Sequence, residues 1–91
     1  MEKTYEVWAL AYNKDYEVMD FEQLLGEFET KPEAIKFAKK LDPNVLIDKK
    51  KLDNDDIVHI QVETVVEIDG GYENIDTIYE NDYTLTNGIL V

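Results

Sequence analysis

Residues 57 to 68 alternate between apolar and polar side chains, and this pattern constrains the fold more than any other. One set of alternate positions holds Val58, Ile60, Val62, Thr64, Val66 and Ile68, and the other holds His59, Gln61, Glu63 and Glu67. Because successive side chains of a β-strand point to opposite faces of its sheet, this segment predicts a strand with one buried face. The other face is expected to meet solvent or a partner.

Turn residues place a second strand beside it. Asp69-Gly70-Gly71 is typical of a hairpin turn, and residues 75 to 85 return with mixed apolar and acidic positions as a strand or a pair of strands. We expect a hairpin over residues 57 to 80.

The N-terminal third predicts further strands. Residues 4 to 12 contain no breaker and are largely apolar in both alternating sets, which indicates a central strand. The aromatic residues Tyr5, Trp8, Tyr12 and Tyr16 are interpreted as core packing, the alternative being an aromatic surface that attracts cations. Asn13-Lys14-Asp15 predicts a turn, and a second strand is expected over about residues 23 to 29.

The strongest local signal is Thr30-Lys31-Pro32-Glu33, which matches a capping box and predicts a helix from residue 31. One stripe of this helix is apolar and is expected to cover a side of the sheet: Ala34, Ile35, Phe37, Ala38 and Leu41. Asp42-Pro43 should end the helix, and residues 44 to 56 are expected to be a connection.

These elements predict one small α+β domain over residues 1 to 91. We expect mainly an antiparallel sheet of about four strands packed on one helix, in the order ββαββ. The chain is too short for a second core, and 44% hydrophobic residues are too many for a disordered chain.

Charge is distributed unevenly. The chain has 21 Asp and Glu against 9 Lys and no Arg, a net charge of −12, and no lysine follows Lys51. An anionic C-terminal half repels nucleic acid and anionic membranes and attracts basic surfaces. The candidate partner-binding residues are Asp55, Glu63, Glu67, Asp69, Glu73, Asp76, Glu80 and Asp82. The alternative is a solvated face that keeps the protein soluble.

Catalytic and metal-binding motifs are not recognisable. There is no Cys or Ser, and residues 53 to 56 begin like a calcium loop but lack its later ligands, so they predict a solvated turn. His59 is the only histidine and is expected to be exposed and non-catalytic. We therefore expect no enzyme activity, no cofactor and no metal.

In size and charge alone, the chain resembles small nucleic-acid mimics made by phages and mobile elements, such as the uracil-DNA glycosylase inhibitor and several anti-restriction proteins. We therefore predict a non-enzymatic binding protein, cytoplasmic and of bacterial or phage origin, whose acidic C-terminal half engages a basic protein surface as a nucleic-acid mimic or inhibitor. The alternative is a self-associating accessory or structural domain, paired through Ile89-Leu90-Val91 or through a strand edge.

Overall fold

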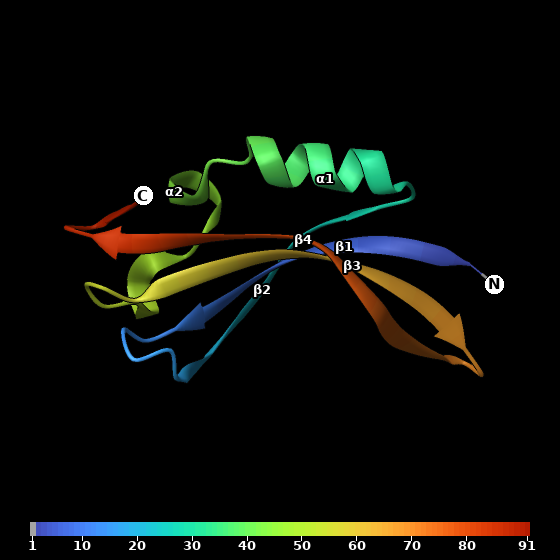
Figure 1. Ribbon diagram of the computed structural model, residues 1–91, viewed down its shortest axis with the longest axis horizontal. Coiled ribbons are helices and arrows are strands. Elements are labelled where there is room, and N and C mark those ends of the chain that lie inside the picture. The colour runs from blue at the N-terminus through green and yellow to red at the C-terminus, as the bar shows by residue number, and fades with distance from the viewer. Residues whose placement is uncertain (1) are drawn as a thin grey trace.

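A computed structural model describes residues 2–91 as a curled antiparallel sheet with its longest helix packed on one side (Figure 1). The elements, in chain order, are β1 (Lys3–Tyr12), β2 (Val18–Phe28), α1 (Lys31–Lys40), α2 (Pro43–Leu46), the 3-10 helix η1 (Lys49–Lys51), β3 (Ile57–Ile68), β4 (Gly71–Thr86) and β5 (Ile89–Leu90). The strand order is β2-β1-β3-β4-β5. The antiparallel sheet, the central position of β1 and the β3–β4 hairpin confirm the sequence-based predictions.

The number of strands and the extent of β2 differ from expectation. The sheet has five strands rather than about four, because Asn87 and Gly88 turn the chain with φ angles of 52° and 81° and let β5 pair with the end of β4. The strand expected over about 23 to 29 runs from Val18 to Phe28. The side chain of Asn13 explains the early start, because its Oδ1 accepts backbone N–H groups of Asp15 and Glu17 and closes a short turn.

Helix α1 begins at Lys31, as predicted. The Thr30 hydroxyl oxygen accepts the backbone N–H of Glu33 at 3.4 Å, and the hydroxyl donates to Glu33 Oε1 at 2.6 Å. In a complete capping box the Glu33 carboxylate would accept the backbone N–H of Thr30; here it accepts the Thr30 hydroxyl instead. The connection after Asp42 also differs from expectation, because it contains α2 and η1.

The core lies between α1 and one face of the sheet. Val58, Ile60 and Val62 are fully buried on this face, which confirms the predicted alternation of β3. Small side chains let helix and sheet approach closely: Ala9 and Ala11 in β1, and Ala34 and Ala38 in α1.

The helix covers only part of the long β3–β4 hairpin. Ten helical residues span about 15 Å, whereas the twelve residues of β3 span about 40 Å. Ile68, predicted on the buried face, is therefore 41% exposed near the hairpin tip. No helix within residues 2–91 is long and apolar enough to cross a membrane.

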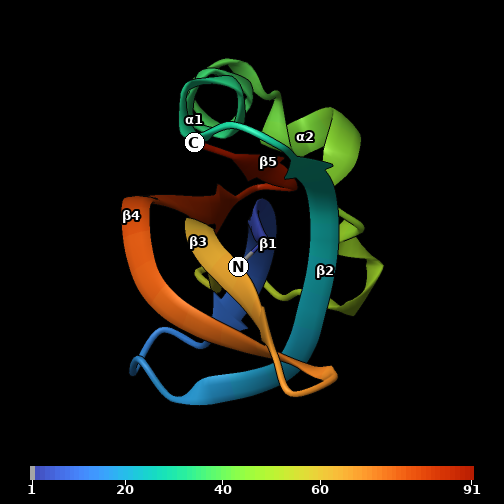
Figure 2. The same cartoon turned by 90° about the vertical axis from the view of Figure 1, so that its right-hand side faces the viewer.

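Seen along its length, the sheet curves away from the helices, with β2 and β4 descending on opposite sides (Figure 2). The face turned away from α1 is therefore concave. This face carries the polar side chains of the central strands.

Candidate functional site

The register of β1 and β3 assembles the concave face. Facing residues of an antiparallel pair project to the same side of the sheet. The facing pairs on this side are Glu6 with Glu63, Trp8 with Gln61 and Leu10 with His59. On the outer strands, Glu22 faces Leu10, Glu80 faces Gln61 and Asp82 faces His59. We call Glu6, Trp8, Glu22, His59, Gln61, Glu63, Glu80 and Asp82 the anionic face.

A hollow of about 320 Å³ lies on the anionic face around Trp8. Its lining comes from all four long strands: Glu6, Trp8, Leu10, Glu22, Gln61, Glu63 and Asn74. Trp8 Nε1 donates to Glu6 Oε1 at 2.9 Å, and Gln61 Nε2 donates to Glu63 Oε1. The expectation that Trp8 packs in the core is wrong, because the alternation of β1 places it on the side away from α1. Trp8 is half-buried and lines the hollow.

Three carboxylates of the hollow repel one another. Burial raises the pKa of Glu63 above its ordinary value, and the negative charges of Glu6 and Glu22 raise that pKa further. The arrangement therefore favours a positive charge brought in from outside.

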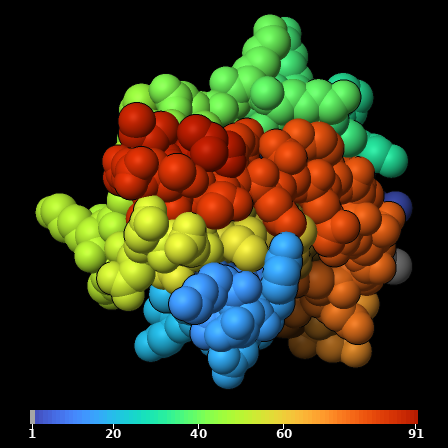
Figure 3. Space-filling view, turned by 60° about the vertical axis from the view of Figure 1, so that its left-hand side comes forward, coloured from blue at the N-terminus to red at the C-terminus, as the bar shows by residue number. Residues whose placement is uncertain are grey.

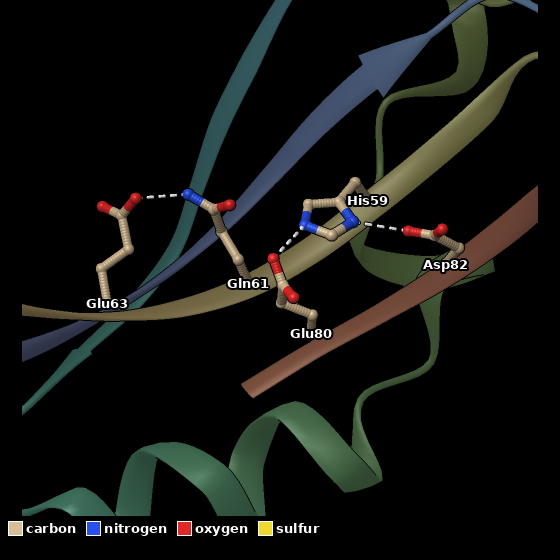
Figure 4. A network of polar contacts seen from close by, with 5 residues as sticks. All are labelled: His59, Gln61, Glu63, Glu80 and Asp82. Atoms are coloured by element: carbon tan, nitrogen blue, oxygen red, sulfur yellow. Dashed lines mark hydrogen bonds and ion pairs between the residues drawn. The ribbon is translucent and has the colours of Figure 1, made fainter. Parts of the chain in front are cut away.

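A second anionic group surrounds His59 (Figure 4). His59 Nδ1 lies 2.5 Å from Asp82 Oδ1, and Nε2 lies 3.3 Å from Glu80 Oε1. The His59 side chain is 16% exposed, so the expectation of an exposed histidine is wrong. Tyr12 packs against the ring in an edge-on arrangement with a centroid distance of 6.1 Å. His59 thus holds the two carboxylates in place beside the Trp8 hollow.

The group around His59 does not have the geometry of a metal site. Its two carboxylates lie on different ring nitrogens, so the three side chains do not converge on one point. Within residues 2–91, no group of three or more His, Cys, Asp or Glu side chains is arranged to hold a metal ion.

Within residues 2–91, no lysine forms an ion pair with the anionic face, although Lys51 lines a neighbouring hollow together with Glu22. Among these described residues, the only nitrogen of a basic side chain closer than 4.0 Å to a carboxylate oxygen belongs to the His59 ring, whose two nitrogens contact Glu80 and Asp82. Lys31, Lys36, Lys39 and Lys40 lie on α1, which covers the other side of the sheet. In the part of the chain that the structure describes, residues 2–91, the carboxylates around Trp8 therefore have no lysine counter-ion in contact with them.

The predicted partner-binding residues separate into groups. Glu63, Glu80 and Asp82 lie on the anionic face, and Glu67 is on the same side of β3 but near the hairpin tip, beside Tyr72. Glu73 and Asp76 face Val66 and Thr64, which places them on the opposite side of the sheet. Asp55 and Asp69 are in turns with φ angles of 73° and 49°. The eight predicted residues therefore do not form one surface.

The sequence analysis missed Glu6, Trp8 and Glu22. All three precede the anionic C-terminal half on which that analysis concentrated. An available signal was Glu6 itself, because a carboxylate two positions from Trp8 interrupts an otherwise apolar strand and marks one of its faces as polar. Only the pairing of β1 with β2 and β3 brings Glu22 and Glu63 beside it.

The turn of residues 53 to 56 carries a structural role. Asp56 is 6% exposed, and its Oδ2 accepts the backbone N–H of Asp53 at 2.7 Å. Asn54 Oδ1 accepts the backbone N–H of Asn87 and so links this turn to the β4–β5 turn. The segment is a turn before a strand, as predicted, but one of its carboxylates is buried.

Comparison with protein-family models, with curated proteins and with solved structures found no match to this chain.

Proposed function

We propose that this protein is a non-enzymatic binding protein whose anionic face engages a basic surface of another protein, as a nucleic-acid mimic. The observation that carries the proposal is the group of Glu6, Glu22 and Glu63 around the half-buried ring of Trp8. Glu6 and Glu63 accept hydrogen bonds from Trp8 and Gln61, but the charges of Glu6 and Glu22 disfavour the ionised form of Glu63, and this repulsion is not needed for folding.

The chemistry of the hollow fits a cationic side chain. A guanidinium or ammonium group over the Trp8 ring gains cation–π attraction, and it relieves the repulsion among the carboxylates. Glu80 and Asp82 extend the negative potential along β4. A row of carboxylates on a sheet competes for a cationic groove by the same attraction that draws the groove to phosphates.

Two charge-matched variants test the proposal. The first, Glu6→Gln with Glu22→Gln and Glu63→Gln, changes the hollow. The second, Asp69→Asn with Glu73→Gln and Asp76→Asn, removes the same charge from the hairpin tip and leaves the hollow intact. Wild type and both variants are immobilised and exposed to a lysate of the source organism, and captured proteins are eluted by rising salt or by duplex DNA.

We expect wild type and the tip variant to retain basic nucleic-acid-binding proteins that both salt and DNA displace. The hollow variant should retain about tenfold less at equal protein concentration, which corresponds to about 1.4 kcal/mol. If both variants lose the same amount of captured protein, binding depends on net charge alone and not on the anionic face. Displacement by salt but not by DNA would reject mimicry, and no capture by wild type would reject the proposal.

Self-association is a second candidate, favoured by the open edges of β2 and β4. The tail named for it in the sequence analysis is already used within the chain, because Leu90 is 3% exposed and β5 pairs with β4. Acidic side chains on both edges oppose pairing of two copies. Light scattering after size-exclusion chromatography decides: a dimer at low salt supports this candidate, and a monomer at high concentration rejects it.

A further inference from the structure

The outer edge of β4 is open along most of its length. Strand β5 pairs with Leu85 and Thr86, and the Thr84 backbone exchanges hydrogen bonds with Val91 at 2.9 and 3.0 Å. Within residues 2–91, no strand pairs with this edge between Gly71 and Tyr83. In the space-filling view, the orange atoms of β4 lie uncovered beside the red C-terminal residues (Figure 3). The chain's own last residues thus demonstrate that this edge accepts a strand.

The register shows which backbone groups are free. In an antiparallel sheet, alternate residues direct their N–H and C=O groups to alternate neighbours. Thr84 bonds outward to Val91, and the pairing of β4 with β3 is regular from Tyr79 to Thr84. Asp82 and Glu80 therefore direct their backbone groups outward, where each offers one donor and one acceptor.

The other open edge is less suited to a further strand. The pairing of β2 with β1 is interrupted at two places, after Val7 and after Leu10. The connection between α2 and η1 also lies against β2, because the Gln23 side chain bonds to Leu46 O and to the backbone N–H of Asp48. The regular end of β4 has neither obstacle.

The side chains at the free edge define the chemistry of an incoming strand. Glu80 and Asp82 lie on the anionic face with side chains 61% and 54% exposed, and His59 holds one oxygen of each. Asn81 lies between them and points to the other side of the sheet, as do Tyr79 and Tyr83. A strand added here places two of its side chains, separated by one residue, beside Glu80 and Asp82.

We infer that an extended segment of a partner protein, with basic residues at alternate positions, adds to the sheet along the β4 edge at Glu80 and Asp82. Its cationic side chains meet the two carboxylates, and its intervening uncharged side chain lies beside Asn81. This inference rests on the proposed function and supplies its geometry: backbone bonds give register, and the anionic face selects charge. A second copy of the chain does not fit, because β4 contains no lysine and would set acid against acid.

Three labelled peptides of equal composition and charge test the inference by fluorescence anisotropy at low salt. The first alternates lysine and valine. The second places its lysines and valines in separate blocks, which destroys the alternation. The third alternates but carries N-methyl groups on alternate amides, which removes the backbone donors that would bond to β4.

We expect the alternating peptide to bind about tenfold more tightly than either control. It should also slow hydrogen exchange of the Glu80 and Asp82 amides, which are free in the protein alone. The Tyr79 and Asn81 amides, directed to β3, should change little. Equal binding of all three peptides, abolished in the hollow variant, would overturn strand addition and leave the proposed function intact. Absence of binding by any peptide would overturn both.

Variants of the protein separate this site from net charge. Glu80→Gln with Asp82→Asn should weaken the alternating peptide about tenfold, whereas Glu73→Gln with Asp76→Asn, on the same strand, should have less than about a threefold effect. If both double variants weaken peptide binding equally, the strand does not add at Glu80 and Asp82. Without peptide, hydrogen exchange of the Glu80 and Asp82 amides should not depend on protein concentration. If it slows as the concentration rises, the strand that adds to β4 is a second copy of the chain, and the inferred partner segment is wrong.

Discussion

The two faces of the central sheet come from the same strands but follow different rules. On the side of α1, the alternate residues in the covered part of the sheet are apolar and buried: Val7, Ala9 and Ala11 in β1, and Val58, Ile60 and Val62 in β3. The alanines of β1 and α1 let helix and sheet approach closely. On the concave side, the carboxylates of Glu6, Glu22 and Glu63 line the hollow around Trp8, and the charges of Glu6 and Glu22 raise the pKa of the partly buried Glu63. The first face is accounted for by folding alone. The second brings repelling carboxylates together, which folding does not require, and we propose that this arrangement serves binding.

The largest effect is expected for substitutions that compare how much each face of the sheet contributes to the free energy of unfolding. Ile60 and Gln61 are neighbours on β3 that point to opposite faces. Ile60→Ala should destabilise the protein by about 2–5 kcal/mol, because it leaves a cavity in the core. Gln61→Ala should cost about 0.5 kcal/mol or less, since its side chain is half-exposed. Chemical denaturation measures both, and similar losses would show that the concave face is also a core.

The covering helix should be sensitive at its first turn. Thr30→Ala removes both bonds between the Thr30 hydroxyl and Glu33 and should lower the free energy of unfolding by about 1 kcal/mol. Thr30→Ser keeps the hydroxyl and serves as the control. If Thr30→Ser lowers stability as much as Thr30→Ala does, the effect comes from the lost methyl group and not from capping.

Salt should affect the concave face more than the packed face. Raising ionic strength from about 10 mM to about 300 mM shortens the screening length from roughly 30 Å to under 8 Å and weakens repulsion among the carboxylates. We expect the melting temperature to rise by about 3–5 °C, which is less than about 1 kcal/mol for a domain of this size. The hollow variant should respond less steeply than the tip variant. Equal slopes would indicate that repulsion is spread over the whole molecule.

The smallest expected effect is a gain in stability on removing the charge of Glu63. The raised pKa of Glu63 means that the folded protein binds this proton more tightly than the unfolded chain does. Its favourable contribution is present below the unfolded pKa of about 4.3 and is lost as pH rises through the higher folded pKa. Glu63→Gln should therefore stabilise the protein at pH 7, by about 0.5 kcal/mol or less because the site is partly exposed.

The gain from Glu63→Gln should shrink as pH falls below about 4, because Glu63 becomes protonated in both the folded and the unfolded state. Glu67→Gln, on an exposed position of the same strand, is the control and should change stability little at either pH. Denaturation curves at the two pH values measure the difference. A variant less stable than wild type at pH 7 would contradict the repulsion inferred around Trp8.

Local signals were sufficient for several elements. The start of α1 follows from Thr30 and Pro32, because capping involves only neighbouring residues. The buried face of β3 follows from alternation at Val58, Ile60 and Val62. Strand β5 was missed, although Asn87-Gly88 is a strong hairpin signal, because only two residues after the turn pair with β4.

The candidate site depended on pairing that no local pattern contains. Glu63, Glu80 and Asp82 were predicted as partner-binding residues and lie on the anionic face, but Glu73 and Asp76 were grouped with them and lie on the other side. Asp76 is four positions from Glu80 and would share its side, but the irregularity in the pairing of β4 with β3 after Val62 moves Asp76 to the other side. A second irregularity, after Thr64, reverses that shift, so Glu73, seven positions from Glu80, lies on the other side by simple alternation. A bulge shifts every later side chain to the other face, and its position is set by the partner strand.

The sequence by itself determined the composition, the excess of negative charge, the start of α1 and the face of β3 that enters the core. These properties depend on residue types and on periods of two or a few residues. The tertiary structure alone decided that Glu6 and Glu22 join Glu63 around Trp8, and that the regular end of β4 remains open. Both depend on strand order and register, which bring together residues more than 40 positions apart and are fixed by burial of the whole sheet.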